Sequence, residues 1–281
     1  MSNGPDTPSR LRSANQHNQG LDPSHDAPYA KGHAWAGDSA GVDGGDFDTV
    51  HNGEASGRPT GPRVTDFAPP PAPGPDMIKG RHVVLERLDP HRHSEDMFAA
   101  NQGQDWVWDY LGYGPFADLP SYRDWQAGMA AKVDPFFYAL RDAATGEVGG
   151  LAAFLRIDPA NGVIEIGHIE IAPLMQRTPA ATEAISLMIG WAFGAGYRRV
   201  EWKCDALNAP SRRAALRYGF IFEGVFRQHM IYKGRNRDTA WYAIIDQDWP
   251  AVAHAHETWL APENFDAQGR QRQSLSALTV R

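Results

Sequence analysis

The chain has 281 residues, a formal net charge of -7 and 42% hydrophobic residues. The negative charge argues against general nucleic-acid binding, and no run of 18 apolar residues is present, which argues against a membrane partner. One cysteine, Cys204, and a start without a basic segment before an apolar core predict no disulfide framework, no signal peptide and a cytoplasmic protein.

Residues 1–75 differ in composition from the rest of the chain. Glycine and proline fill 22 of these 75 positions, whereas Leu, Ile, Val and Phe fill only 7. Such a segment has too little apolar surface to offset the entropy lost on ordering, and the run APPPAP at 68–73 is typical of a stiff linker. We therefore predict a disordered extension over 1–75, a folded domain over 76–250 and a C-terminal helix and tail over 251–281.

The first half of the predicted domain contains three strands and two helices. The pattern predicts a strand over 82–88, helices over 90–101 and 121–133, and strands over 136–140 and 148–157. Between the two helices lies a segment dense in aromatic residues and glycine. Its simplest interpretation is a packed loop that covers the core.

The sequence is organised around residues 165–193. The β-branched residues before Pro173 predict a strand, and Thr178 followed by Pro179 is typical of an N-cap and a first helical residue. A strand that runs through a tight turn into a helix presents free amides at the helix start, and Arg177 adds a positive charge there. The segment therefore indicates a phosphate-binding turn, with an ordinary strand-to-helix turn as the alternative.

The rest of the domain completes a layered sheet. Residues 199–206 alternate between apolar and charged side chains, as a strand does. A short helix over 210–218 and a hairpin of strands over 220–232 and 239–246 follow. The resulting order β-α-α-β-β-β-α-β-α-β-β is that of a mixed α/β protein.

The predicted phosphate-binding turn also resembles a known motif. QRTPAA at 176–181 resembles the Q/R-x-x-G-x-G/A pyrophosphate loop of the GNAT acyltransferases, and the ATEA that follows is close to the continuation in their RimJ/RimL branch. Pro179 departs from the motif, because it stands where the loop usually has glycine. Proline has no amide, so one hydrogen-bond donor is missing.

Two further motifs resemble the same branch, in the same order. NAPS at 208–211 with YGF at 218–220 resembles its N-x-x-S…GF segment, and RQHM at 227–230 with GRNRD at 234–238 resembles its closing hairpin. The resemblance covers roughly residues 78–250.

The resemblance implies an α/β fold of the GNAT type, a mixed and mostly antiparallel sheet flanked by helices. It implies acetyl-CoA as cosubstrate and no metal. Backbone amides near Ile169 would hold the pantetheine arm, and the turn at 176–182 would hold the pyrophosphate. The residues expected to contact acetyl-CoA are Ile169, Glu170, Ile171, Gln176, Arg177, Thr178, Ala180, Ala181, Thr182, Asn208 and Ser211.

Acetylation of an amine also requires proton transfers. An alkylammonium group has a pKa near ~10.4, so a base must take its proton at neutral pH. Glu165 is our first candidate, because it lies eleven residues before Gln176, the spacing of the catalytic glutamate in the histone-acetyltransferase branch. The other candidates are Glu170, His168 and Asp205. Lys203 occupies the position of the RimI-type base, and a protonated lysine cannot take that role.

The departing thiolate benefits from a proton donor, and the resemblance implies Ser211 for this role. The alternative for Ser211 is an ordinary polar residue in the first turn of a helix, and that for Asn208 is a residue that begins the helix. Many GNAT members carry a tyrosine seven residues after this asparagine, but here that position is Ala215.

The acceptor site is expected between the first two predicted helices, because this segment overlies the acceptor pocket in a GNAT architecture. The candidate substrate-contacting residues are Trp106, Trp108, Asp109, Tyr110 and His168. The sequence thus predicts an enzyme that moves an acetyl group from acetyl-CoA to a small-molecule amine or a protein N-terminus, within a homodimer. The alternative is a non-catalytic acyl-CoA-binding regulator.

Overall fold

The computed structural model describes residues 51–52 and 59–280. The chain divides into two compact units, Met1–Thr65 and Asp66–Arg281. In the first unit, β1 (His51–Asn52) pairs antiparallel with β2 (Pro59–Thr60), and most of the predicted extension lies outside the described residues. The second unit begins at Asp66, earlier than the expected domain start at residue 76.

Residues 67–75, expected as part of a linker, belong to the second unit and contact side chains elsewhere in it. The ring of Phe67 lies 5.9 Å from the Arg198 guanidinium. The hydroxyl of Tyr197 donates to the Pro71 carbonyl at 2.9 Å, and that of Tyr138 donates to the Pro75 carbonyl at 2.8 Å. Proline-rich backbone has carbonyls but few amides, so tyrosine hydroxyls are suitable partners for it.

The second unit is built on one sheet of eight strands in the order β3-β4-β5-β6-β7-β8-β10-β9. Neighbours are antiparallel except for the parallel pair β7–β8. This confirms the predicted mixed, mostly antiparallel sheet. The strands are β3 (Met77–Lys79), β4 (Val83–Arg87), β5 (Phe136–Asp142), β6 (Val148–Asp158), β7 (Val163–Ile171), β8 (Arg199–Asp205), β9 (Ile221–Tyr232) and β10 (Arg235–Ile245).

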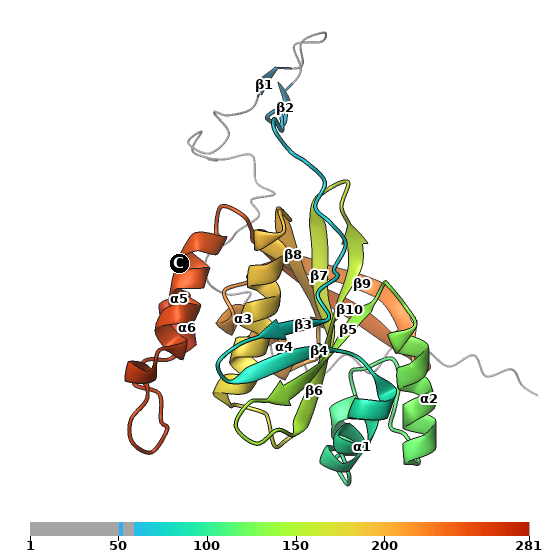
Figure 1. The fold of residues 1–281 in the computed structure, drawn as a ribbon. Coiled ribbons are helices and arrows are strands. Elements are labelled where there is room, and N and C mark those ends of the chain that lie inside the picture. Colours follow the sequence, from blue (N-terminus) through green and yellow to red (C-terminus); the bar gives the residue numbers. More distant parts are fainter. Residues whose placement is uncertain (1–50, 53–58, 281) are drawn as a thin grey trace, which may run out of the picture. The chain divides into compact units, whose positions relative to one another are not determined.

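Helices cover both faces of the sheet (Figure 1). On each face, the helices and the sheet enclose a separate hydrophobic core. One face carries α1 (Pro90–Ala100), the 3-10 helix η2 (Asp105–Trp108) and α2 (Leu119–Ala130). The other carries α3 (Pro179–Gly194), α4 (Ala209–Arg217), α5 (Trp249–Leu260), the 3-10 helix η3 (Pro262–Asn264) and α6 (Leu275–Leu278). The two cores share β5, whose Tyr138 and Phe137 face opposite sides.

The C-terminal segment, which the sequence predicted as a helix and tail, contains α5 and α6 and belongs to the second unit. Trp259 and Leu275 are buried in the same core as α3. The hydroxyl of Thr279 donates to the Arg217 carbonyl at 3.3 Å, which holds the last residues against α4.

Two irregularities in β7 shape the site. Its register against β6 shifts between the pairs Leu151–Glu170 and Ala153–Gly167, and His168 within this bulge has a φ of +50°. β7 pairs with β8 only from Val163 to Glu165, so the strands separate beyond that point. Within the described residues, no helix is long and apolar enough to cross a membrane.

Candidate active site

The site is the opening between β7 and β8. Past Glu165, the edge of β7 that faces β8 has no strand paired to it in the part of the chain that the structure describes. Ile169, Glu170 and Ile171 lie on this separated segment. An unpaired strand edge presents backbone donors and acceptors to an extended ligand, which can bind as an added strand would.

The turn after β7 leads directly into α3 and has the features of an anion site. The Thr178 hydroxyl accepts from the Ala181 amide at 3.2 Å, which confirms the predicted N-cap, and Pro179 is the first helical residue. The amides of Arg177 and Ala180 have no hydrogen-bond partner among the described residues. Arg177 is exposed and has a φ of +64°. Free amides, the helix dipole and one guanidinium together favour a bound phosphate.

The other residues predicted at this turn have structural contacts. The Gln176 side-chain amide donates to the Ile171 carbonyl at 2.9 Å and braces the end of β7. Ala180 and Thr182 are buried beneath the turn. Arg217, which the sequence did not indicate, donates to the Thr182 hydroxyl at 3.2 Å. Arg217 brings a second guanidinium to the first turn of α3. This contact depends on the packing of α4 beside α3, so it cannot be inferred from the sequence.

Asn208 and Ser211 lie at the start of α4. The Asn208 side-chain oxygen accepts from the Ser211 amide at 3.0 Å, so Asn208 is the N-cap. The Ser211 hydroxyl accepts from the Trp202 indole at 3.0 Å. Cys204 lies nearby, and burial raises the pKa of its thiol to about 11, while a hydrogen bond with the Ser211 hydroxyl acts to lower the pKa of that thiol. The thiol is therefore protonated and unreactive at neutral pH.

Glu165 lies on the opposite face of the sheet from Ser211. Its carboxylate is 3% exposed and forms ion pairs with Arg156 at 2.7 Å and Lys203 at 3.0 Å. Lys203 also pairs with Glu201 at 2.6 Å and lies 3.9 Å from the centre of the Trp241 ring. The two residues predicted as catalytic are thus not in contact, and Glu165 belongs to a buried network of charges.

A cavity of about 620 Å³ lies at the end of β8, and we call it the acceptor cavity because Asp109 and Tyr110, two of the residues expected to contact the acceptor, line it. It is lined by Asp109, Tyr110, Asp205, Leu207, Tyr232, Arg235 and Asn236. Asp205 accepts from the Tyr232 hydroxyl at 2.9 Å and from the Leu207 amide at 2.8 Å. Burial, together with Asp205, raises the pKa of Tyr232 to about 12. The cavity therefore holds two carboxylates beside a hydroxyl that stays protonated.

The structure separates the four candidates from the segment 105–116. Asp109 and Tyr110 line the acceptor cavity. Trp108 is buried, and its carbonyl accepts from the Lys233 ammonium at 2.8 Å, which ties η2 to the β9–β10 hairpin. Trp106 is 51% exposed and donates only to neighbouring Gln104 among the described residues.

His168 and Glu170 both face α1 and α2 from β7. Burial lowers the pKa of His168 to about 4, so its imidazole is neutral at pH 7. One ring nitrogen lies 3.3 Å from the Tyr113 hydroxyl. Glu170 is 2% exposed, and burial raises the pKa of its carboxyl to about 8. No group of three or more metal-ligating side chains occurs in the ranges 51–52 and 59–280.

Comparison with known proteins identifies the family. The family described as Acetyltransferase (GNAT) domain matches residues 82–221. A GCN5-related N-acetyltransferase from Brucella melitensis is 46% identical, with a TM-score of 0.75 over 77% of this chain and 99% of that one. The ribosomal-protein-serine acetyltransferase of Escherichia coli is 34% identical over 36% of this chain and 57% of its own length. The uncharacterized N-acetyltransferase p20 of Bacillus licheniformis is 26% identical over 51% of this chain and 82% of its own. The chain therefore belongs to the GNAT family of acetyltransferases.

Proposed function

We propose that the chain transfers an acetyl group from acetyl-CoA to a primary amine by direct attack in a ternary complex. One observation carries this proposal: the opening between β7 and β8 has a turn with free amides and an exposed arginine at one end, and a cavity lined by Asp109, Asp205 and Arg235 lies beside β8. Acetyl-CoA is an anion through its phosphates, whereas an amine acceptor arrives as a cation. The positive charge at the turn suits the phosphates, and the two carboxylates of the cavity, which outnumber the single guanidinium of Arg235, suit an ammonium group.

The residues present suit acetyl-CoA as the donor. The free amides of Arg177 and Ala180 at the start of α3 would bind a diphosphate, despite the missing amide of Pro179. The unpaired edge of β7 near Ile169 supplies backbone groups to a pantetheine arm. The Asn208 side chain uses its oxygen as a helix cap, so its amide group is the part that can reach the donor.

For the base we propose Asp205 rather than Glu165. Asp205 lines the acceptor cavity, so it can take the ammonium proton directly or through a water. Glu165 lines neither cavity described in this chain and is held by two cations. A proton on Glu165 would leave Lys203 and Arg156 with weaker partners. We propose that Glu165 positions Lys203 and fixes β6, β7 and β8 to one another.

For the donor of the second proton we retain Ser211. Its hydroxyl accepts from Trp202, which orients the oxygen and leaves the hydrogen directed elsewhere. A thiol has a pKa near ~8.5, so the thiolate leaves readily and needs modest assistance. Much of the rate would come from holding the amine beside the thioester.

The proposed acceptor is either a protein N-terminus or a small amine. The ribosomal-protein-serine acetyltransferase relative supports a protein acceptor and the RimJ/RimL-like branch. We also propose that the protein is cytoplasmic and forms a homodimer. Sedimentation of the purified chain tests the homodimer.

The function is tested by adding a panel of amines to the protein and acetyl-CoA. The panel contains peptides with free N-termini and small primary amines, with N-acetylated peptides as the control. We expect thiol release together with a product 42 Da heavier than the acceptor, the mass of an added acetyl group. Binding of acetyl-CoA without turnover of any amine would contradict the proposal.

A further inference from the structure

The acceptor cavity contains a cation that the proposed transfer reaction does not use. Its charged lining residues are the carboxylates Asp109 and Asp205 and the guanidinium Arg235. An acceptor whose only charge is an ammonium group would have no partner for Arg235 and would be repelled by it. Two anions and one cation in the same cavity are instead complementary to a ligand that carries both charges.

Strand pairing separates Arg235 from Asp205 within this cavity. Arg235 lies opposite Tyr232 across the turn between β9 and β10, and residues opposite each other in an antiparallel pair project from the same face. Asp205 lies opposite Thr239, four residues further along β10. At about 3.3 Å per residue, the backbone positions are roughly 13 Å apart along the strand. A ligand that contacts both side chains therefore carries its two charged groups several bonds apart.

Arg235 is free to bind such a ligand, whereas the neighbouring cations have contacts of their own. The Lys233 ammonium donates to the Trp108 carbonyl at 2.8 Å. The guanidinium of Arg237 lies 5.8 Å from the centre of the Tyr232 ring. The Arg235 side chain is exposed and has no ion pair or hydrogen bond within the part of the chain that the structure describes. Its planar group matches a carboxylate in geometry as well as in charge.

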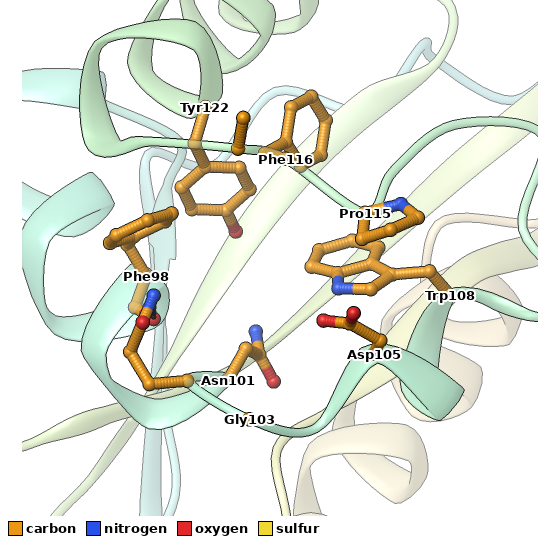
Figure 2. A pocket seen from close by; sticks show the side chains of 10 residues that line it. Phe98, Asn101, Gly103, Asp105, Trp108, Pro115, Phe116 and Tyr122 are labelled. Carbon is orange, nitrogen blue, oxygen red and sulfur yellow. Dashed lines mark hydrogen bonds between the residues drawn. The ribbon is translucent and has the colours of Figure 1, made fainter.

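A second cavity, of about 400 Å³, does not offer such a partner. It lies between α1, η2 and α2 and shares no lining residue with the acceptor cavity (Figure 2). Aromatic rings form much of its wall, and its only charged lining residue is Asp105. A carboxylate would be repelled there. Of these two cavities, the acceptor cavity is therefore the one that suits an acidic group.

We propose that the acceptor is a primary amine that carries a carboxylate several bonds from its nitrogen, with the ammonium group on Asp205 and the carboxylate on Arg235. This inference rests on the proposed transfer of an acetyl group to an amine, and it names the class of amine. A peptide with an acidic side chain at its second position has this arrangement, and so does a small amino acid whose two charged groups lie at opposite ends of an alkyl chain. The two sources share one chemistry and are distinguished by experiment.

The test compares acceptors that differ only in the carboxylate. One pair consists of two peptides with free N-termini, with glutamate or glutamine at the second position. The other pair is δ-aminovalerate and its uncharged amide. Kd is measured by calorimetric titration of the full chain in the presence of CoA, which has no acetyl group to transfer. We expect the acidic member of at least one pair to bind about fivefold more tightly, as for an ion pair at an exposed guanidinium. The pair with the preference identifies the source.

Three variants show whether Arg235 causes the preference. Arg235→Gln should abolish it, so that the two members of a pair bind alike. Arg235→Glu should reverse it, because the cavity then has a third carboxylate. Arg227→Gln removes the same charge from an exposed position on β9 that does not line the cavity, and it should keep the preference of the wild type. High salt should weaken the preference, since it screens exposed charges.

Equal affinity within both pairs would overturn the inference, as would absence of binding by every acidic acceptor or an unchanged preference in Arg235→Gln. If neither Arg235 variant folds, the comparison of acid with amide on the wild type decides the question. Acetyl transfer is measured separately, as thiol release from acetyl-CoA. Preferential binding of acidic acceptors without transfer would contradict the proposed function alone. Transfer to amines together with equal affinity within both pairs would contradict this inference alone.

Discussion

At the scale of single residues, the groups proposed to move protons differ in what they touch. Asp205 lines a cavity and keeps Tyr232 as its partner. Ser211 lies on the other face of β8, against Trp202. The base acts on the amine and the serine acts on the leaving sulfur, so their loss should affect the pH profile differently.

We expect Asp205→Asn to lower kcat by about 10²- to 10⁴-fold near neutral pH, the range of general acid–base catalysis. The deficit should narrow as pH approaches the pKa of the amine, because solvent then supplies the free base. Ser211→Ala should lower kcat by a pH-independent factor of about 10² or less. The measurement is kcat against pH, with the Kd of acetyl-CoA as control. Wild-type turnover of Asp205→Asn at pH 7 would move the base to another residue.

Glu165 is expected to contribute to stability. Glu165→Gln leaves Lys203, whose side chain is 5% exposed, with Glu201 as its remaining carboxylate partner among the described residues. Removing one partner of a buried ion pair costs about 3 kcal/mol, measured here as the free energy of unfolding in urea. Glu223→Gln is the matched control, because Glu223 is the exposed end of the same network and should cost under about 1 kcal/mol. Equal losses for both variants would contradict this role.

The sequence predicted local residue roles better than long-range ones. Thr178 was identified as an N-cap because the cap and the amide it accepts from are three residues apart. The β-branched pattern placed Glu165 correctly on a strand, β7, but its partners Arg156 and Lys203 come from β6 and β8. Only the strand register brings those side chains together. For the same reason the sequence could not reveal Arg217 beside Thr182.

At the scale of elements, the turn between β7 and α3 determines donor binding. Ala180 is buried, so the exposed Arg177 is the better residue to change. Arg177→Gly removes the charge and suits the positive φ of this position. We expect acetyl-CoA affinity to fall by about tenfold while the melting temperature of the free protein is kept or raised. Arg270→Ala, in the C-terminal loop, is the control, and unchanged affinity of Arg177→Gly would place the phosphates elsewhere.

Element prediction succeeded where apolar periodicity was strong. The helix from Pro179 and the strand before it are confirmed. β3 was missed because three residues carry too little pattern, and it forms only by pairing with β4. The bulge at His168 also depends on the partner strand, since it is a difference in register between β6 and β7.

At the scale of the whole molecule, the compact unit begins at Asp66, whereas composition predicted a start at residue 76. The proline-rich segment has few apolar side chains, but its carbonyls accept from Tyr197 and Tyr138. A chain that begins at Asp66 should have the melting temperature of the second unit in the full chain. One that begins at residue 76 should lose about 2 kcal/mol of unfolding free energy, because each hydrogen bond contributes about 1 kcal/mol. Equal melting temperatures for the two truncated chains would show that the segment contributes nothing.

The separation of β7 from β8 has a consequence for solvent exchange. Outside the bulge at His168, amides of β7 that point toward β6 are paired with that strand, whereas those past Glu165 that point toward β8 have no strand among the described residues to protect them. In heavy water, neighbouring amides along this segment should therefore take up deuterium at alternating rates, fast and slow. Addition of CoA should slow the fast set and leave the slow set unchanged, because only one edge is open to a ligand. Protection from exchange along one edge of β7 thus comes from pairing with β6, and protection along the other edge comes from the bound substrate.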